Sequence, residues 1–182
     1  MNRSLPVPMT EPSNQITSLT AILLRDLQAL RRCIDAYPDD ALPWRQPPGV
    51  PNSAGTLALH VAGNLRHFVG ATLGGTGYIR DRALEFSARG LPRTELAAGL
   101  RATEAEVLDT LGRLTPEHLQ REYPLALAAH RFTTGDLLLH LAVHLGYHLG
   151  QADYHRRVVT GDPAPIGAMA LDALASARPA DG

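Results

Sequence analysis

The 182-residue sequence lacks several features that would mark a functional class. It has one cysteine, Cys33, which excludes an internal disulfide and a cysteine-rich zinc site. Its 17 basic and 18 acidic residues nearly balance, so there is no electrostatic footprint for nucleic acid or for an anionic membrane surface. Any metal site must therefore use nitrogen and oxygen ligands, and neither nucleic acid nor membrane is an expected partner.

Long apolar runs and strand patterns are also missing. No stretch approaches the roughly 20 apolar residues that a membrane span needs, and the first ten residues lack the apolar core of a secretory signal. We therefore expect a cytoplasmic protein. Alternating segments typical of β-strands are almost absent, and the length suits one domain with a sizeable core.

The sequence does contain long apolar repeats at helical spacing, separated by proline and glycine. These repeats predict four long helices, at about 13–37, 54–73, 92–113 and 133–161. Ser13, Ser53 and Thr133 are expected N-caps, and Gly161 is an expected helix stop. The proline-rich segment between the first two helices, 38–52, is predicted to be non-helical.

The fold class predicted from this pattern is all-α, a four-helix bundle over residues 13–162. Residues 1–12 carry three prolines and are interpreted as a flexible N-terminal arm. Residues 163–182 form an Ala/Pro-rich tail, in which 166–177 is compatible with a short helix against the bundle.

The most distinctive stretch is HLAVHLGYHLGQ, from His140 to Gln151. At about 100° per residue, His140, His144 and His148 are offset by only about 40° from one to the next, so they form one stripe along the helix. The other residues are apolar on nearly all sides, which predicts a buried helix with inward-pointing histidines. Buried imidazoles need partners, and one metal ion can satisfy several of them.

A specific metal site follows from this stripe. His144 and His148 lie one turn apart and can bind one ion, and His60 is the best-placed third ligand from another helix. His67 lies about 10.5 Å farther along that helix at 1.5 Å per residue, so it cannot reach the same ion. Three nitrogens leave a position open for water or substrate, as in catalytic sites. His140 is interpreted as a supporting or core residue.

Other chemically notable residues have less specific interpretations. Cys33 is expected to be a small core residue, and Trp44 is expected to plug the bundle end rather than line a pocket. The cluster at 80–85 either binds an anion or, as we favour, forms a surface salt-bridge network. Gln151 either orients a ligand or a histidine, or makes a structural hydrogen bond. The remaining histidines are expected to be structural or surface residues: His118, His130 and His155.

Three blocks of the sequence resemble the DinB-like superfamily of damage-inducible four-helix proteins. They are LALHVAGNLR at 57–66, RDRALEF at 80–86 and HLAVHLGYHLGQ at 140–151, and the similarity extends over about 14–160. The resemblance implies an up-down-down-up bundle, frequent dimers, and a divalent metal ion, commonly zinc or nickel, on the residues matching His60, His144 and His148. In some members it also implies thiol S-transferase activity with bacillithiol or mycothiol. Leu149 stands where many relatives carry arginine.

Three functional hypotheses remain open at this point. The first is a metal-dependent thiol S-transferase acting on a small electrophile, with Gln151 contacting the ligand. The second is a non-catalytic bundle that binds a small ligand or serves stress physiology, and the third is a metal-dependent hydrolase. Leu145 stands where the H-E-x-x-H motif has its glutamate, which favours thiol transfer over hydrolysis. The apolar last helix, with Gly146 and Gly150, also predicts a homodimer.

Overall fold

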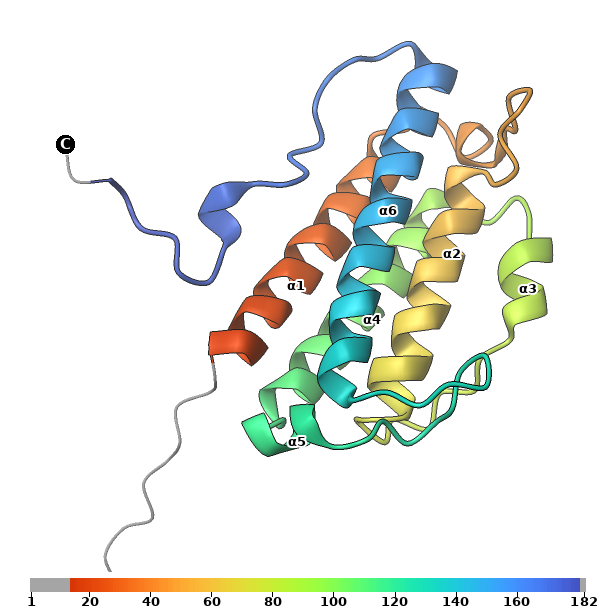
Figure 1. Cartoon of the computed structure of the whole chain (residues 1–182). Helices are drawn as coiled ribbons and strands as arrows, with labels where there is room; N and C mark the ends of the chain where they lie inside the picture. Colours follow the sequence, from red (N-terminus) through yellow and green to blue (C-terminus); the bar gives the residue numbers. More distant parts are fainter. Residues whose placement is uncertain (1–13, 181–182) are drawn as a thin grey trace, which may run out of the picture.

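The computed structural model describes residues 14–180 and is all-helical within them, as predicted (Figure 1). The α-helices are α1 (Asn14–Asp35), α2 (Ala54–Leu65), α3 (Arg82–Ser87), α4 (Arg93–Gly112), α5 (Pro116–Gln120) and α6 (Thr134–Thr160). The shorter elements are η1 (Leu42–Trp44), η2 (Arg66–Ala71) and η3 (Leu171–Ala173). The predicted arm at 1–12 and the predicted cap Ser13 lie outside the described residues.

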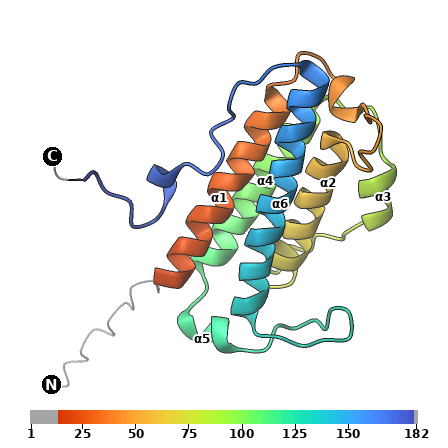
Figure 2. The same ribbon diagram turned by 45° about the horizontal axis from the view of Figure 1, so that its top comes forward.

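The four long helices pack around a common core. Each contacts two neighbours, in the order α1, α4, α2, α6 and back to α1, and Figures 1 and 2 show them side by side. The short helices α3 and α5 lie at the periphery, α3 against α2 and α5 against α6. Along α1 the predicted apolar stripe is buried throughout: Ile16, Leu19, Leu23, Leu27, Leu30 and Ile34. None of the helices within residues 14–180 combines the length and hydropathy that a membrane span needs.

Local capping fixes where the two site-bearing helices begin and end. The Ser53 hydroxyl accepts a hydrogen bond from the Thr56 amide at the start of α2. The Thr133 hydroxyl accepts one from the Asp136 amide at the start of α6, and Gly161 ends α6 with a left-handed φ of 72°. These residues satisfy backbone groups that helix ends leave without partners.

The second predicted helix differs from expectation near its end. After α2 the chain continues into the π-helical segment η2, in which the Thr72 amide donates to the His67 carbonyl five residues earlier. A π turn widens the helix by one residue and rotates everything after it relative to a regular helix. The 3.6-residue pattern of the sequence does not reveal such an insertion.

Three smaller expectations are revised by the structure. Pro92 is the N-cap of α4 rather than its first helical residue. The proline-rich segment 38–52 includes the short η1, and the tail helix predicted at 166–177 reduces to the three residues of η3. Proline supplies the φ angle of a single helical turn without supporting a long helix.

The prediction that α6 is buried on nearly all sides is wrong. One side of the helix is exposed and apolar, and we call it the α6 face: Leu139, Val143, Tyr147, Tyr154 and Val158. Its neighbours α1, α2 and α5 cover only the other sides. In a ring of four helices each helix keeps an outward surface, and apolar composition alone does not say which residues occupy it.

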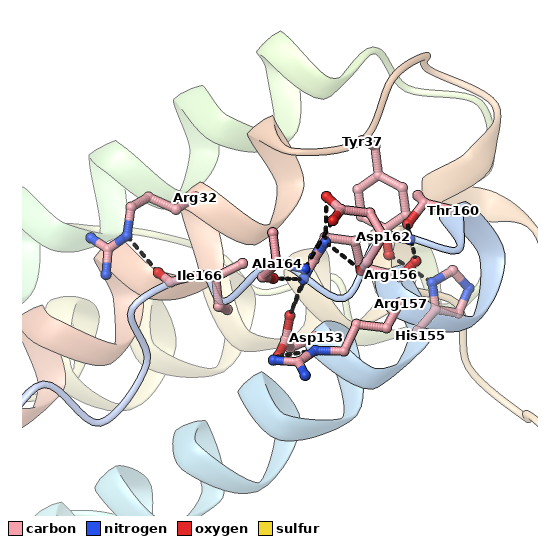
Figure 3. A network of polar contacts seen from close by, with 10 residues as sticks. All are labelled: Arg32, Tyr37, Asp153, His155, Arg156, Arg157, Thr160, Asp162, Ala164 and Ile166. Carbon is pink, nitrogen blue, oxygen red and sulfur yellow. Dashed lines mark hydrogen bonds and ion pairs between the residues drawn. The ribbon is translucent and has the colours of Figure 1, made fainter.

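A buried arginine ties the C-terminal segment to the end of the bundle (Figure 3). The side chain of Arg156 is 1% exposed. It pairs with Asp153 on its own helix and donates to the carbonyl of Ala164 in the following segment. Arg32 of α1 donates to the Ile166 carbonyl farther along. A buried guanidinium requires such a complete set of acceptors because an unpaired buried charge is costly.

We therefore predict that Arg156→Ala lowers the free energy of unfolding by about 3 kcal/mol, because it removes one partner of a buried network. Arg157→Ala is the matched control. Arg157 pairs with the same aspartate but is 39% exposed, so its loss should cost less than about 1 kcal/mol. Urea denaturation measures both variants, and equal losses would contradict the assigned role of Arg156.

Candidate metal centre

Three histidines from two helices meet at the contact between α2 and α6. His60 lies on α2, and His144 and His148 lie one turn apart on α6. Each offers one ring nitrogen, and these three atoms all lie within 4.8 Å of one another. We call His60, His144 and His148 the histidine triad. The structure thus brings together the three residues that the sequence singled out, and within residues 14–180 no other such group could hold a metal ion.

Two of the three spacings between the triad nitrogens match those of a bound ion's ligands. The Nε2 atoms of His60 and His144 are 3.3 Å apart, and those of His144 and His148 are 3.1 Å apart. Three nitrogens bound to zinc at about 2.05 Å with tetrahedral angles would lie about 3.3 Å from one another. The rings meet edge to face rather than stacked, with interplanar angles of 73° to 89°.

A buried carboxylate fixes the tautomer of His60. The Nδ1 of His60 lies 3.0 Å from Oε2 of Glu85 on α3. An ionised carboxylate only accepts hydrogen bonds, so Nδ1 carries the hydrogen and the Nε2 of neutral His60 keeps a free lone pair. That lone pair is directed toward the other two members of the triad.

Gln151 fixes the tautomer of His148 in the same way. The Nδ1 of His148 lies 2.7 Å from Oε1 of Gln151, one turn farther along α6. The amide oxygen accepts a hydrogen bond, so Nδ1 of His148 is protonated and its Nε2 also presents a lone pair to the triad centre. Of the two uses expected for Gln151, the structure shows the orientation of a histidine.

The donor set of the triad fits a divalent cation. A proton on Nε2 of His144 could be shared with only one of the two facing lone pairs, whereas one cation can accept all three. Imidazole nitrogens suit zinc, nickel, copper and iron. A three-nitrogen set also leaves a coordination position for water or a substrate.

Burial keeps His60 and His144 in the neutral form that binds metal. Burial lowers the pKa of His60, although the hydrogen bond to Glu85 acts in the opposite direction. Burial, reinforced by the neighbouring His148 and His60, lowers the pKa of His144 to about 4. His60 and His144 are therefore neutral near pH 7, and metal ligation by histidine requires the neutral ring.

The burial of Arg80 and Glu85 contradicts one expectation from the sequence. We favoured a surface salt-bridge network for this cluster, but the two side chains are only 11% and 6% exposed. The Nε of Arg80 donates to Oε1 of Glu85 at 2.6 Å, and Oε2 accepts from both Nη2 of Arg80 and Nδ1 of His60. Burial raises the pKa of Glu85, but the hydrogen bonds from Arg80 and His60 outweigh it, so the net pKa is lowered.

Sequence reasoning did not identify Glu85 as the partner of His60. The two residues are 25 positions apart, and their contact depends on how α3 packs against α2. Gly63 makes this packing possible, because a Cβ at that position would overlap Oε1 of Glu85. The available signal was general: a histidine ligand usually donates its second nitrogen to a carboxylate or carbonyl.

The other five histidines of the sequence lie outside the triad. His140 is exposed and not in the core, contrary to the expectation of an inward-pointing residue, and its ring centroid lies 6.2 Å from that of His144. The ring of His67 packs edge-on against Phe68. As expected from its distance along the helix, His67 is not part of the group that includes His60. His155 is buried and structural, with hydrogen bonds to the Tyr37 hydroxyl and the Arg45 carbonyl. The other two act locally: His118 caps α5, and His130 contacts the Ala128 carbonyl.

Cys33 and Trp44 are structural, as predicted. Cys33 is fully buried, and burial raises the pKa of its thiol to about 12. Its thiol is therefore protonated and unreactive at neutral pH. The indole ring of Trp44 packs against Gly55 at the start of α2, and its N–H donates to the Leu91 carbonyl.

We predict that Glu85→Ala weakens zinc binding about 10- to 100-fold, because His60 loses the acceptor that fixes its tautomer. Glu85→Gln keeps an oxygen acceptor and should weaken binding less. Glu106→Ala is the matched control, since Glu106 accepts two hydrogen bonds from Arg66 but contacts no triad residue. Competition with a zinc-chelating dye measures the three affinities. If Glu106→Ala weakens binding as much as Glu85→Ala, the positioning role of Glu85 is wrong.

Comparison with known proteins agrees with this geometry. A search of the curated proteins gives no match. The family model described as the DinB superfamily matches residues 22–152, a range that includes the whole triad, Glu85 and Gln151. Since the match covers well over half of the chain, this protein belongs to the DinB superfamily.

Proposed function

We propose that this protein binds one divalent metal ion, zinc or nickel, on His60, His144 and His148, and uses it to transfer a low-molecular-weight thiol to a small electrophile. The observation that carries the proposal is the convergence of the Nε2 lone pairs of His60 and His148 on the Nε2 of His144. Family membership supports it. The thiol co-substrate of this proposal is bacillithiol or mycothiol.

The metal would supply the activation of the thiol. A divalent ion favours the deprotonated, nucleophilic form of a sulfur ligand, so no separate base is needed to activate it. His60, His144 and His148 would hold the ion through three nitrogens, and the remaining coordination position would be available to the co-substrate.

The residues around the triad favour thiol transfer over hydrolysis. Both oxygens of Glu85 are engaged, Oε1 by Arg80 and Oε2 by His60 and Arg80, so this carboxylate is not free to act as a general base for water. Leu145, at the position of the catalytic glutamate in H-E-x-x-H, is buried. The chain's single thiol, Cys33, is also buried, so a reacting thiol has to come from a second molecule.

Several finer features belong to the same proposal. The four long helices run up-down-down-up, residues 13–162 form the domain, and 1–12 and 163–182 are appendages. The protein acts in the cytoplasm, where low-molecular-weight thiols are kept reduced. It forms a homodimer in which a second copy covers the part of the α6 face formed by Leu139, Val143 and Tyr147, since an exposed apolar surface is typical of an interface. Sedimentation equilibrium at micromolar concentration tests the dimer, and a monomer throughout would contradict it.

The metal test uses protein purified without a histidine tag. We predict about one divalent ion per chain, lost in His60→Ala and in His144→Ala because two nitrogens hold the ion poorly. His140→Ala is the matched control: it lies on the same helix one turn before His144 but is exposed and outside the triad. Elemental analysis measures the ion content. Equal retention in all three variants would contradict the assigned ligands.

The activity test uses the metal-loaded protein with bacillithiol, mycothiol or glutathione and a panel of small electrophiles. We predict turnover with at least one thiol that disappears on metal removal and returns on reloading. Ion binding without turnover for any thiol would support the non-catalytic alternative. Hydrolysis of ester or amide substrates by the loaded protein, without thiol, would support the hydrolase.

A further inference from the structure

A pocket of about 260 Å³ lies beside the triad, at the end of the bundle where α2 begins. One wall is the proline-rich loop 47–52, which follows η1. The other walls come from the two helices that carry the triad: Leu57 of α2, and Gln151, Tyr154, His155 and Val158 of α6.

Gln151 and Leu57 place the pocket next to the triad. Gln151 lines it and also holds Nδ1 of His148 at 2.7 Å. Leu57 precedes His60 by one turn on α2. Along α6, Tyr154 lies about 9 Å beyond His148 at 1.5 Å per residue. A molecule anchored at the triad could thus extend into the pocket without leaving the α2–α6 surface.

The lining of the pocket is suited to an uncharged, apolar group. None of its lining residues is acidic or a lysine or arginine. The ring of His155 offers no free nitrogen. Its Nδ1 is hydrogen-bonded to the Tyr37 hydroxyl (Figure 3), and its Nε2 is hydrogen-bonded to the Arg45 carbonyl. Burial also lowers its pKa, so the ring is neutral. A charged ligand would find no counter-charge here, whereas an apolar one gains by leaving water.

The side chain of Gln151 offers a bound ligand one hydrogen-bond donor. Its Oε1 is used by His148, which leaves the amide NH₂ as a donor. Within residues 14–180 no group accepts a hydrogen bond from this NH₂, and Gln151 is exposed. A ligand passing from the triad to the pocket would satisfy it with a carbonyl or similar oxygen.

We propose that this pocket binds the apolar tail of a small molecule whose head group is held at the metal, with an acceptor oxygen between them on Gln151. The proposal rests on the metal centre proposed above and adds the substrate class: an uncharged, medium-length alkyl or aryl compound with a metal-binding head. Tyr154 and Val158 form the rim over which the tail enters.

Two hydroxamates serve as probes, because both share a metal-binding head with a carbonyl oxygen and differ only in their tails. Acetohydroxamate reports binding at the metal, and octanoylhydroxamate adds six methylenes. A fully buried methylene tightens binding about fourfold, so partial burial of this tail should tighten it at least about 50-fold. Isothermal titration of the zinc-loaded protein gives both affinities and their ratio.

Val158→Asp and Val143→Asp provide a matched pair of variants. Both valines lie on the α6 face and are similarly exposed, 62% and 66%, but only Val158 lines the pocket. We predict that Val158→Asp binds octanoylhydroxamate no more than about fivefold more tightly than acetohydroxamate, because the variant places a carboxylate against the tail. Val143→Asp should keep the wild-type ratio.

The same pair of probes separates this inference from the proposed function. If the protein takes up no zinc, acetohydroxamate does not bind and the metal proposal fails. The affinity of octanoylhydroxamate for the metal-free protein, compared between Val158→Asp and Val143→Asp, then still reports the pocket. A ratio near one in the unmutated protein overturns the pocket, as does an equal loss in Val143→Asp and Val158→Asp. A tail effect that only Val158→Asp removes supports it.

Discussion

The hydrogen bonds that hold the outer nitrogens of His60 and His148 determine what this bundle can do. Glu85 accepts a hydrogen bond from Nδ1 of His60, and Gln151 accepts one from Nδ1 of His148. The Nε2 lone pairs of both histidines therefore face His144. A lone proton cannot satisfy all three nitrogens, and a divalent cation can. The folded chain therefore presents a cluster whose mutual repulsion is relieved on metal binding, which couples metal affinity to the stability of the α2–α6 contact.

The frame around the triad is built to keep those hydrogen bonds in place. Arg80 neutralises the buried Glu85 and engages both of its oxygens, and Gly63 leaves room for that carboxylate against α2. Such an ion pair adds little net stability, because desolvation offsets most of the attraction. Its effect is to orient His60. On the side of Gln151, by contrast, the neighbouring pocket has no charged residue in its lining.

Much of the helical frame and the pairing of His144 with His148 could be predicted from the sequence, because both depend on local periodicity. His60 could be named as their partner only because the sequence resembles a known family. A spacing of four residues puts His144 and His148 on one face whatever surrounds the helix, and the Ser53 cap and the Gly161 stop act within a few residues. What escaped prediction depends on contacts between distant segments. The partnership of Glu85 with His60 requires the packing of α3 against α2, and the exposure of the α6 face depends on which sides its neighbours cover. The π turn of η2 has no periodic signature at all.

Every functional conclusion depends on the three imidazoles sharing one ion. Anomalous diffraction at the zinc edge, from crystals of the zinc-loaded protein, tests this directly. We expect one strong peak about 2.0 to 2.1 Å from each Nε2 of His60, His144 and His148, with Nδ1 of His60 still hydrogen-bonded to Glu85. Zinc bound elsewhere, or a triad whose rings have turned away from one another with no peak between them, would contradict it.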